Sequence, residues 1–353
     1  MQPLDCNRAP LHHRERGSFQ YDGNSGESKV KEGLVACVID NDMIAAVSSG
    51  KKAGRAFSDL FVVRTLRRLY PNVKLVAAVE RESQTIDELV RLKPGIVFNL
   101  AFSALPSEAA FVGALEILGI PYTGSGPLGI ALANDKVRSR RLLAAAGIRV
   151  PQFVELSPTH RPAKIDFPPP YFVKPAISGN SVGIHAKSMA DSYARALKQA
   201  DRIWRELEQP SVCDEFIVGR EFHVSLIERK RGVFKTAGIV ELHFARTEPG
   251  KGFSTQVNIV KGKDRRTYKV RHRRATLTRR QLTELSEIAA TAANLLQLRG
   301  YAKVDMRMDQ EGRIAVIEVN ANPALWNGEI WRRPSFETNL KWVMEAALRK
   351  ALE

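Results

Sequence analysis

The chain has 353 residues, which is long for a single hydrophobic core and suits two or three domains. Hydrophobic residues make up 44% and charged residues 26%, as in ordinary soluble globular proteins, and no apolar run approaches the roughly 20 residues that span a bilayer. The formal net charge of +16 favours an anionic ligand, but no zinc finger or aromatic stacking pattern accompanies it, so the sequence does not favour a nucleic-acid partner.

Residues 1–33 are rich in Gly, Ser, Asn, Arg and His, and they predict a flexible tail that lacks the apolar segment of a secretory signal. The cysteines Cys6, Cys37 and Cys213 are widely spaced, and none belongs to a pair with metal-ligand spacing. Reduced thiols and the missing signal predict a cytoplasmic protein.

Strands alternate with helices over residues 34–126. A buried strand at 34–40 precedes an amphipathic helix around 57–69, and this order repeats up to a turn-rich segment at 121–127. Such alternation predicts a parallel sheet covered on both faces, which is an N-terminal, Rossmann-like α/β domain. The other expected elements here are strands at 73–79 and 95–100 and helices at 87–92 and 107–118.

Residues 127–213 and 214–353 are expected to form a central and a C-terminal α/β domain. A long loop expected at 243–277 carries a basic block at 261–274, which suits a solvated surface or a role on phosphates. The expected strands are 171–174, 212–218, 220–227 and 233–242, and the expected helices are 134–146, 189–207, 278–298 and 336–352.

The most informative segment, 301–323, has two alternating runs around a polar turn at 309–312, which predicts a β-hairpin. Alternation places Asp305 close to opposite Glu318, with Asn320 on the same face of its strand. Two carboxylates and an amide oxygen are hard ligands of the kind that hold Mg²⁺ on substrate phosphates, so the hairpin predicts a metal site. The alternative is a solvated sheet face, on which charged residues also alternate.

A second candidate site follows the strand at 171–174. Gly179, Ser181 and Gly183 lie in a short loop before the next helix, and Lys174 stands at the strand end. Glycines let backbone amides approach phosphate oxygens, the serine can donate a hydrogen bond, and the lysine supplies positive charge. The loop matches neither the Walker pattern nor the dinucleotide fingerprint, and a glycine-rich turn without a nucleotide is an equal alternative.

Several short motifs together carry a family resemblance. Over roughly residues 95–325 the sequence resembles the D-alanine–D-alanine ligases, which are members of the ATP-grasp superfamily. The resemblance implies a three-domain α/β architecture of the ATP-grasp type, in which ATP lies between the last two sheets and the N-terminal domain binds substrate. The motifs are 121–126, Asp135-Lys136, 173–175, 179–183, 219–222, and Val304-Asp305 with 318–320.

The resemblance also implies roles for individual residues. The nucleotide phosphates would be bound by Lys136, Lys174, Ser181, Gly183 and Lys261. The adenine would contact Asp214, Glu215, Phe216 and Ile217, and the ribose would contact Glu221. Magnesium, or manganese, would be held by Asp305, Glu318 and Asn320. The reacting centre would be stabilised by Lys303, Ser181 and Arg307.

The implied reaction joins two small molecules, a carboxylate and an amine, at the expense of ATP. The carboxylate attacks the γ-phosphorus to give an acyl phosphate, and the amine then expels phosphate, so that ADP and phosphate are released. A closed loop over the phosphates keeps water away from the acyl phosphate. Family members are often dimers, which leaves a homodimer open.

The departures from the family pattern concern the substrate more than ATP. The glutamate-bearing segment after the first strand is replaced by 40–50, and the family's His-Gly by Asn99-Leu100, although Glu108 falls near an acidic family position. Lys303 stands in place of an arginine and lacks its planar fork. Two alternatives follow: an ATP-grasp ligase for a different amino acid, peptide or acidic carboxylate, or an ATP-binding homologue without catalysis.

Overall fold

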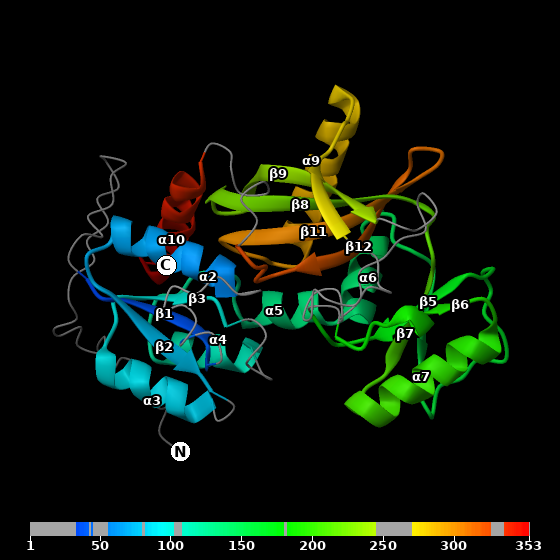
Figure 1. Cartoon of the computed structure of the whole chain (residues 1–353), viewed down its shortest axis with the longest axis horizontal. Coiled ribbons are helices and arrows are strands. Elements are labelled where there is room, and N and C mark those ends of the chain that lie inside the picture. The colour runs from blue at the N-terminus through cyan, green and yellow to red at the C-terminus, as the bar shows by residue number, and fades with distance from the viewer. Residues whose placement is uncertain are drawn as a thin grey trace, which may run out of the picture.

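The computed structural model describes residues 33–41, 44, 56–79, 82–101, 108–179, 182–244, 270–325 and 335–352. These residues form three sheets with their helices, and the five-stranded sheet lies above and between the other two in Figure 1. The predicted N-terminal tail falls almost entirely outside the described residues. None of the described helices is long and apolar enough to cross a membrane.

The first sheet confirms the predicted parallel unit. Its strands pair in the order β2-β1-β3, all parallel, and every residue of β1 is buried because helices cover both faces. Apolar side chains from α2 and the C-terminal helix α10 (Phe336–Leu352) cover one face, and those from α3 and α4 cover the other. The elements are β1 (Val35–Asp40), α2 (Ala56–Leu69), β2 (Val73–Ala78), α3 (Glu82–Leu92), β3 (Ile96–Asn99) and α4 (Glu108–Ile117).

Two short helices connect the first sheet to the second. Helix α5 (Pro127–Asn134) begins with a proline, and α6 (Lys136–Ala145) begins after Asp135. The Asp135 side chain caps α6 by accepting a 2.8 Å hydrogen bond from a backbone N–H of its first turn. The sequence predicted one helix here rather than two, because α5 is a short apolar run without a polar face. The cap fixes where α6 begins, and with it the position of its first residue, Lys136.

The second sheet is antiparallel, with the strand order β4-β7-β5-β6, and α7 (Tyr193–Leu207) packs against it. The prediction of a helix from residue 189 is wrong at its start, because a 3-10 turn (Ala186–Ser188) and β6 precede α7. Strand β4 was not predicted. The strands are β4 (Phe153–Leu156), β5 (Tyr171–Pro175), β6 (Met189–Ala190) and β7 (Ser211–Glu215).

The third sheet is antiparallel and has the order β10-β9-β8-β11-β12. Helix α9 (Arg279–Leu295), capped by Thr278, packs on it, and α10 packs against both β8 and β3 of the first sheet. The predicted loop at 243–277 is wrong in part, because a strand forms near its end, while residues 245–269 lie outside the described part of the chain. The strands are β8 (Gly219–Lys230), β9 (Val233–Phe244), β10 (Val270–Arg274), β11 (Tyr301–Asp309) and β12 (Ile314–Asn320).

The predicted hairpin is present as β11 and β12, but its pairing contains a β-bulge. Asp305 pairs with Glu318, whereas the next residue, Met306, pairs with Val316. Ile317 is therefore the extra residue of β12, with no partner of its own on β11. A bulge bends a strand and redirects the neighbouring side chains, and here it lies beside a predicted metal ligand.

Candidate active site

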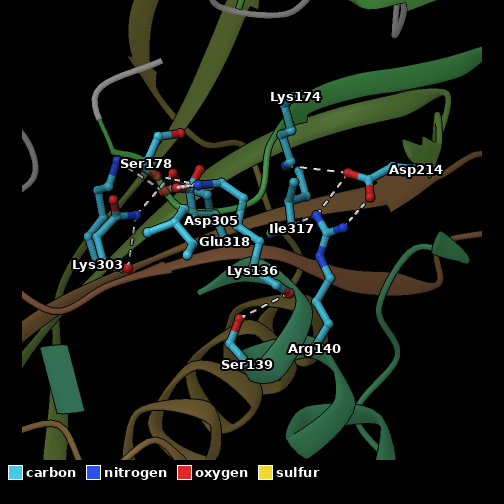
Figure 2. Close-up of polar contacts among 12 residues, drawn as sticks. Lys136, Ser139, Arg140, Lys174, Ser178, Asp214, Lys303, Asp305, Ile317 and Glu318 are labelled. Atoms are coloured by element: carbon cyan, nitrogen blue, oxygen red, sulfur yellow. Dashed lines mark hydrogen bonds and ion pairs between the residues drawn. The ribbon is translucent and has the colours of Figure 1, made fainter. Parts of the chain in front are cut away.

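The predicted metal ligands gather on one face of the third sheet. Asp305 lies directly opposite Glu318, and Asn320 donates a 3.2 Å hydrogen bond from Nδ2 to Asp305 Oδ2. Lys303 Nζ lies 3.1 Å from Asp305 Oδ1, and His223 Nε2 on β8 lies 3.5 Å from the same oxygen. Figure 2 shows Lys303 beside the two carboxylates. The structure therefore brings together all three predicted ligands and the lysine that replaces the family's arginine.

Burial and the neighbouring charges make the two carboxylates titrate differently. Burial raises the pKa of Asp305 to about 7; Lys303 opposes this rise and Glu318 adds to it. Burial also acts to raise the pKa of Glu318, but Lys136, Lys174 and Lys303 together hold it below its ordinary value. Asp305 resists ionisation beside the charged Glu318. A cation bound between the two carboxylates would lower the free energy of ionising Asp305.

The donor set fits a hard divalent cation on a phosphate. Mg²⁺ takes one or two carboxylates from the protein and completes its shell with water and phosphate oxygens. Within the described parts of the chain, no group of three or more His, Cys, Asp or Glu side chains is arranged to hold a metal. The site would therefore rest on the carboxylates of Asp305 and Glu318 and the amide oxygen of Asn320, with substrate oxygens as the remaining ligands.

Two buried lysines reach this corner, one from α6 and one from the second sheet. Lys136, the first residue of α6, places its Nζ 3.3 Å from Glu318 Oε1 and donates a hydrogen bond to the carbonyl of Ser178. Lys174 on β5 places its Nζ 3.4 Å from Asp214 Oδ2, and burial together with Arg140 lowers its pKa to about 8. Both side chains are only 3% exposed, so their charges are poorly screened by water and suit an anion held between the sheets.

Arg307 lies among the predicted nucleotide-binding residues. Its Nη2 donates a 2.7 Å hydrogen bond to Glu221 Oε2, and its Nη1 donates a 2.8 Å hydrogen bond to the carbonyl of Ile217. The guanidinium carbon also lies 4.5 Å from the centre of the Phe216 ring. The arginine thus holds three residues that the resemblance assigns to adenine and ribose. A direct role on the reacting centre, predicted from the sequence, stays a prediction.

The remaining predicted residues of the adenine segment have structural contacts. The Asp214 carboxylate is bound by the guanidinium of Arg140, which lies one helical turn after Lys136 on α6. Glu215 Oε2 accepts a 3.3 Å hydrogen bond from the backbone of Gln152. Arg140 was not singled out from the sequence, although its spacing of four residues from Lys136 places both on one face of α6.

The glycine-rich loop is described at both ends, while Ser181 and Lys261 lie outside the described residues. Gly183 has a φ of +74°, and a Cβ there would lie 2.6 Å from Pro175 Cγ. A side chain is therefore excluded by both backbone conformation and space. At Gly179 an added Cβ would meet nothing within 4 Å, so this end of the loop is open.

A buried network joins α4, which covers the first sheet, to the end of the hairpin. Asn322, just after the predicted ligands, donates a 2.7 Å hydrogen bond from Nδ2 to Glu108 Oε1 on α4 and accepts one from the Tyr301 hydroxyl. Burial raises the pKa of Glu108 to about 7, against the opposing hydrogen bond from Asn322. The acidic position noted in the sequence thus links α4 to the end of the hairpin.

Comparisons with known proteins point to one family. A family model described as D-ala D-ala ligase C-terminus matches residues 142–331. The uncharacterized protein y4sG of Sinorhizobium fredii is 31% identical over 245 residues, which is 68% of either chain. A D-alanine–D-alanine ligase of Haemophilus ducreyi is 26% identical over 326 residues, or 88% of this chain and 99% of that one.

Solved structures give the same fold. The D-alanine–D-alanine ligase of Bacillus anthracis in complex with ATP has a TM-score of 0.68 at 17% identity and covers 90% of this chain and 98% of that one. The VanG D-Ala:D-Ser ligase of Enterococcus faecalis has a TM-score of 0.64 at 18% identity, with 89% and 99% coverage. These likenesses confirm the ATP-grasp architecture predicted from the sequence.

Proposed function

Since the chain belongs to the D-Ala–D-Ala ligase family, whose C-terminal model covers more than half of it, we propose that it uses ATP to join a small carboxylate to an amine. The observation that carries the proposal is the pairing of Asp305 with Glu318, whose carboxylate contacts the buried Lys136 and is held ionised by Lys136, Lys174 and Lys303. Carboxylates that face cations across a domain boundary suit a metal-bound polyphosphate better than a solvated sheet face. The products would be ADP and phosphate.

The nucleotide would lie between the second and third sheets. Lys136 and Lys174 would neutralise the phosphates, and the backbone amides near Gly183 would bind their oxygens. Ser181 and Lys261 are proposed to complete this phosphate site. On the other side, Glu221 would bind the ribose, and the residues assigned to adenine are Asp214, Glu215, Phe216 and Ile217. Arg307 supports this proposal because it orients Glu221 and Phe216 together.

The metal would be held by Asp305, Glu318 and Asn320. Bound there, Mg²⁺ or Mn²⁺ supplies the positive charge that offsets the charge on the transferring phosphoryl group. Asp305 must lose its proton to serve as a ligand, and the nearby Lys303 helps the ionised form. Glu318 is already favoured in its ionised form by three lysines.

The chemistry would proceed in two steps at this corner. A substrate carboxylate oxygen attacks the γ-phosphorus of ATP, the bond to the bridging oxygen breaks, and ADP leaves. The amine then attacks the acyl phosphate carbonyl, loses a proton, and expels inorganic phosphate. Lys303, 21% exposed and 3.1 Å from Asp305, would stabilise the oxyanion that forms at the carbonyl carbon.

The two substrates are small molecules, and D-alanine is one candidate among several. The resemblance weakens in the first domain, and the family's arginine is Lys303 here, which binds a carboxylate as a point charge rather than through a fork. The alternative remains a ligase for another amino acid, a peptide or an acidic carboxylate. A homologue that binds ATP without turnover is less well supported, because the pairing of Asp305 with Glu318 and the contact of Lys136 with Glu318 suit a metal-bound phosphate.

A phosphate-release screen tests the proposal. The protein is incubated with ATP, Mg²⁺ and each amino acid of both chiralities, alone and in pairs, and ADP and phosphate are measured. We expect release that depends on a particular pair and is absent in Asp305→Asn. Nucleotide binding by calorimetry without ADP from any pair would favour the non-catalytic homologue, and release that survives in Asp305→Asn would refute the metal assignment.

A further inference from the structure

The guanidinium of Arg140 joins four elements of two domains. It contacts both carboxylate oxygens of Asp214 on β7, with 2.9 Å between Nη2 and Oδ2, and Nη2 donates a second hydrogen bond of 3.0 Å to the carbonyl of Ile317 on β12. Its guanidinium carbon lies 5.6 Å from the centre of the Phe153 ring on β4. Figure 2 shows the side chain extending from α6 between Asp214 and Ile317. Arg140 is only 1% exposed.

The contact with Ile317 is made at the β-bulge of the hairpin. Ile317 is the extra residue of β12, so its carbonyl is not matched by a partner residue on β11. The next residue is Glu318, whose carboxylate pairs with Lys136, four residues before Arg140 on the same helix. Helix α6 therefore contacts β12 at two successive residues, Ile317 in the bulge and Glu318, the predicted metal ligand.

The contact with Asp214 reaches the second lysine. Asp214 Oδ2, which accepts from Arg140, also lies 3.4 Å from Lys174 Nζ. Arg140 thus contacts Ile317, which precedes Glu318, and Asp214, which pairs with Lys174. Stability alone does not explain the arrangement, because a buried ion pair costs about as much in desolvation as it returns in attraction.

On the basis of the proposed function, we propose that Arg140 is a positioning residue, which locks the bulge at Ile317 and the Asp214–Lys174 pair so that Glu318 and the lysines meet at one fixed geometry. Only a planar guanidinium can bind a carboxylate with two nitrogens and donate to a carbonyl from the same fork. A lysine at this position keeps the buried charge and can pair with Asp214, but it loses the fork.

Arg140→Lys separates positioning from simple charge pairing. The readout that does not depend on catalysis is amide hydrogen exchange over residues 314–320, compared with the wild type at the same pH. We expect exchange there to rise at least about tenfold while β8 and β9 are unchanged, because the bulge loses its tie to α6. We also expect kcat for ADP formation to fall at least about tenfold, with a smaller change in the KM for ATP, because Glu318 acts mainly on the transferring phosphoryl group.

The matched control is Arg141→Lys, because Arg141 is the next residue of the same helix and is exposed. It should leave both exchange and kinetics at wild-type values. Wild-type exchange over 314–320 together with wild-type kcat in Arg140→Lys would overturn the proposal. If the wild type itself forms no ADP, the proposed function fails, and hydrogen exchange alone decides the role of Arg140.

A second variant serves if Arg140→Lys does not fold. The double variant Arg140→Met with Asp214→Asn removes one positive and one negative charge, so the net charge beside Lys174 is unchanged, and it leaves side chains of similar size; such replacements of buried ion pairs are often tolerated without loss of stability. Faster exchange over 314–320 at an unchanged melting temperature supports positioning. Unchanged exchange in this folded double variant contradicts it.

Discussion

Asp305 is the residue at which stability and activity should move in opposite directions. Burial raises the pKa of Asp305 to about 7, from the 3.8 expected in the unfolded chain. Between these values the folded state holds a proton that the unfolded state releases, so stability falls as pH rises from 3.8 towards 7. Replacing Asp305 with Asn removes this loss, because the amide stays neutral at every pH.

The magnitude follows from the size of the shift. Between about pH 5 and about pH 7 the free energy of unfolding falls by about 1.4 kcal/mol per pH unit, and it changes little beyond that. The loss between about pH 5 and pH 8 is therefore about 3 kcal/mol. Without metal, Asp305→Asn should therefore gain up to about 3 kcal/mol relative to the wild type on going from about pH 5 to pH 8. The same variant should form no ADP, because a predicted metal ligand is gone.

The assay is urea unfolding with a chelator present, at both pH values, for the wild type and Asp305→Asn. Asp309→Asn is the matched control on the same strand. Burial acts to raise the pKa of Asp309, but hydrogen bonds from Arg313 and Arg149 hold it below its ordinary value. Its loss should therefore destabilise the protein equally at both pH values. A stability change in Asp305→Asn that is the same at both pH values would refute the reasoning.

Three further outcomes are expected. Glu318→Gln should lower ADP formation by at least about a hundredfold without unfolding the protein, as measured by a coupled ADP assay and by circular dichroism. Gly183→Ala should lower the melting temperature, because its φ is +74° and a Cβ would lie 2.6 Å from Pro175 Cγ, whereas Gly179→Ala should not, because nothing lies within 4 Å. The affinity for ADP, measured by calorimetry, should fall as pH rises through about 8, where Lys174 loses its charge. Lys174→Met should bind ADP more weakly at neutral pH, and its affinity should depend less on pH. A steep pH dependence in that variant would assign the titration to another group.

The sequence was most informative where the pattern is local. The parallel sheet and the hairpin follow from the period of apolar residues and from turn chemistry, and the structure confirms both. That Asp305 lies opposite Glu318 follows from the alternation of side chains between the two faces of a strand. The strand register beyond this pair could not be predicted, because the alternation of hydrophobic and polar residues does not reveal the bulge at Ile317.

Contacts between distant elements were beyond the reach of such patterns. Arg140 reads as one of several basic residues on a helix, and only the fold shows that it is buried between Asp214 and Ile317. The link from Glu108 to Asn322 also joins positions far apart in the sequence. Strand β10 was hidden within a polar, basic segment whose composition is typical of a loop.

The packing of α10 has a consequence for how the chain acquires its structure. One apolar face of the first sheet, including Val35 and Cys37, is covered in part by Leu340, Val343 and Met344, about 300 residues further along. During synthesis, this face stays incompletely covered until α10 has emerged from the ribosome. The first sheet is thus early in the sequence but among the last parts of the chain to complete its core.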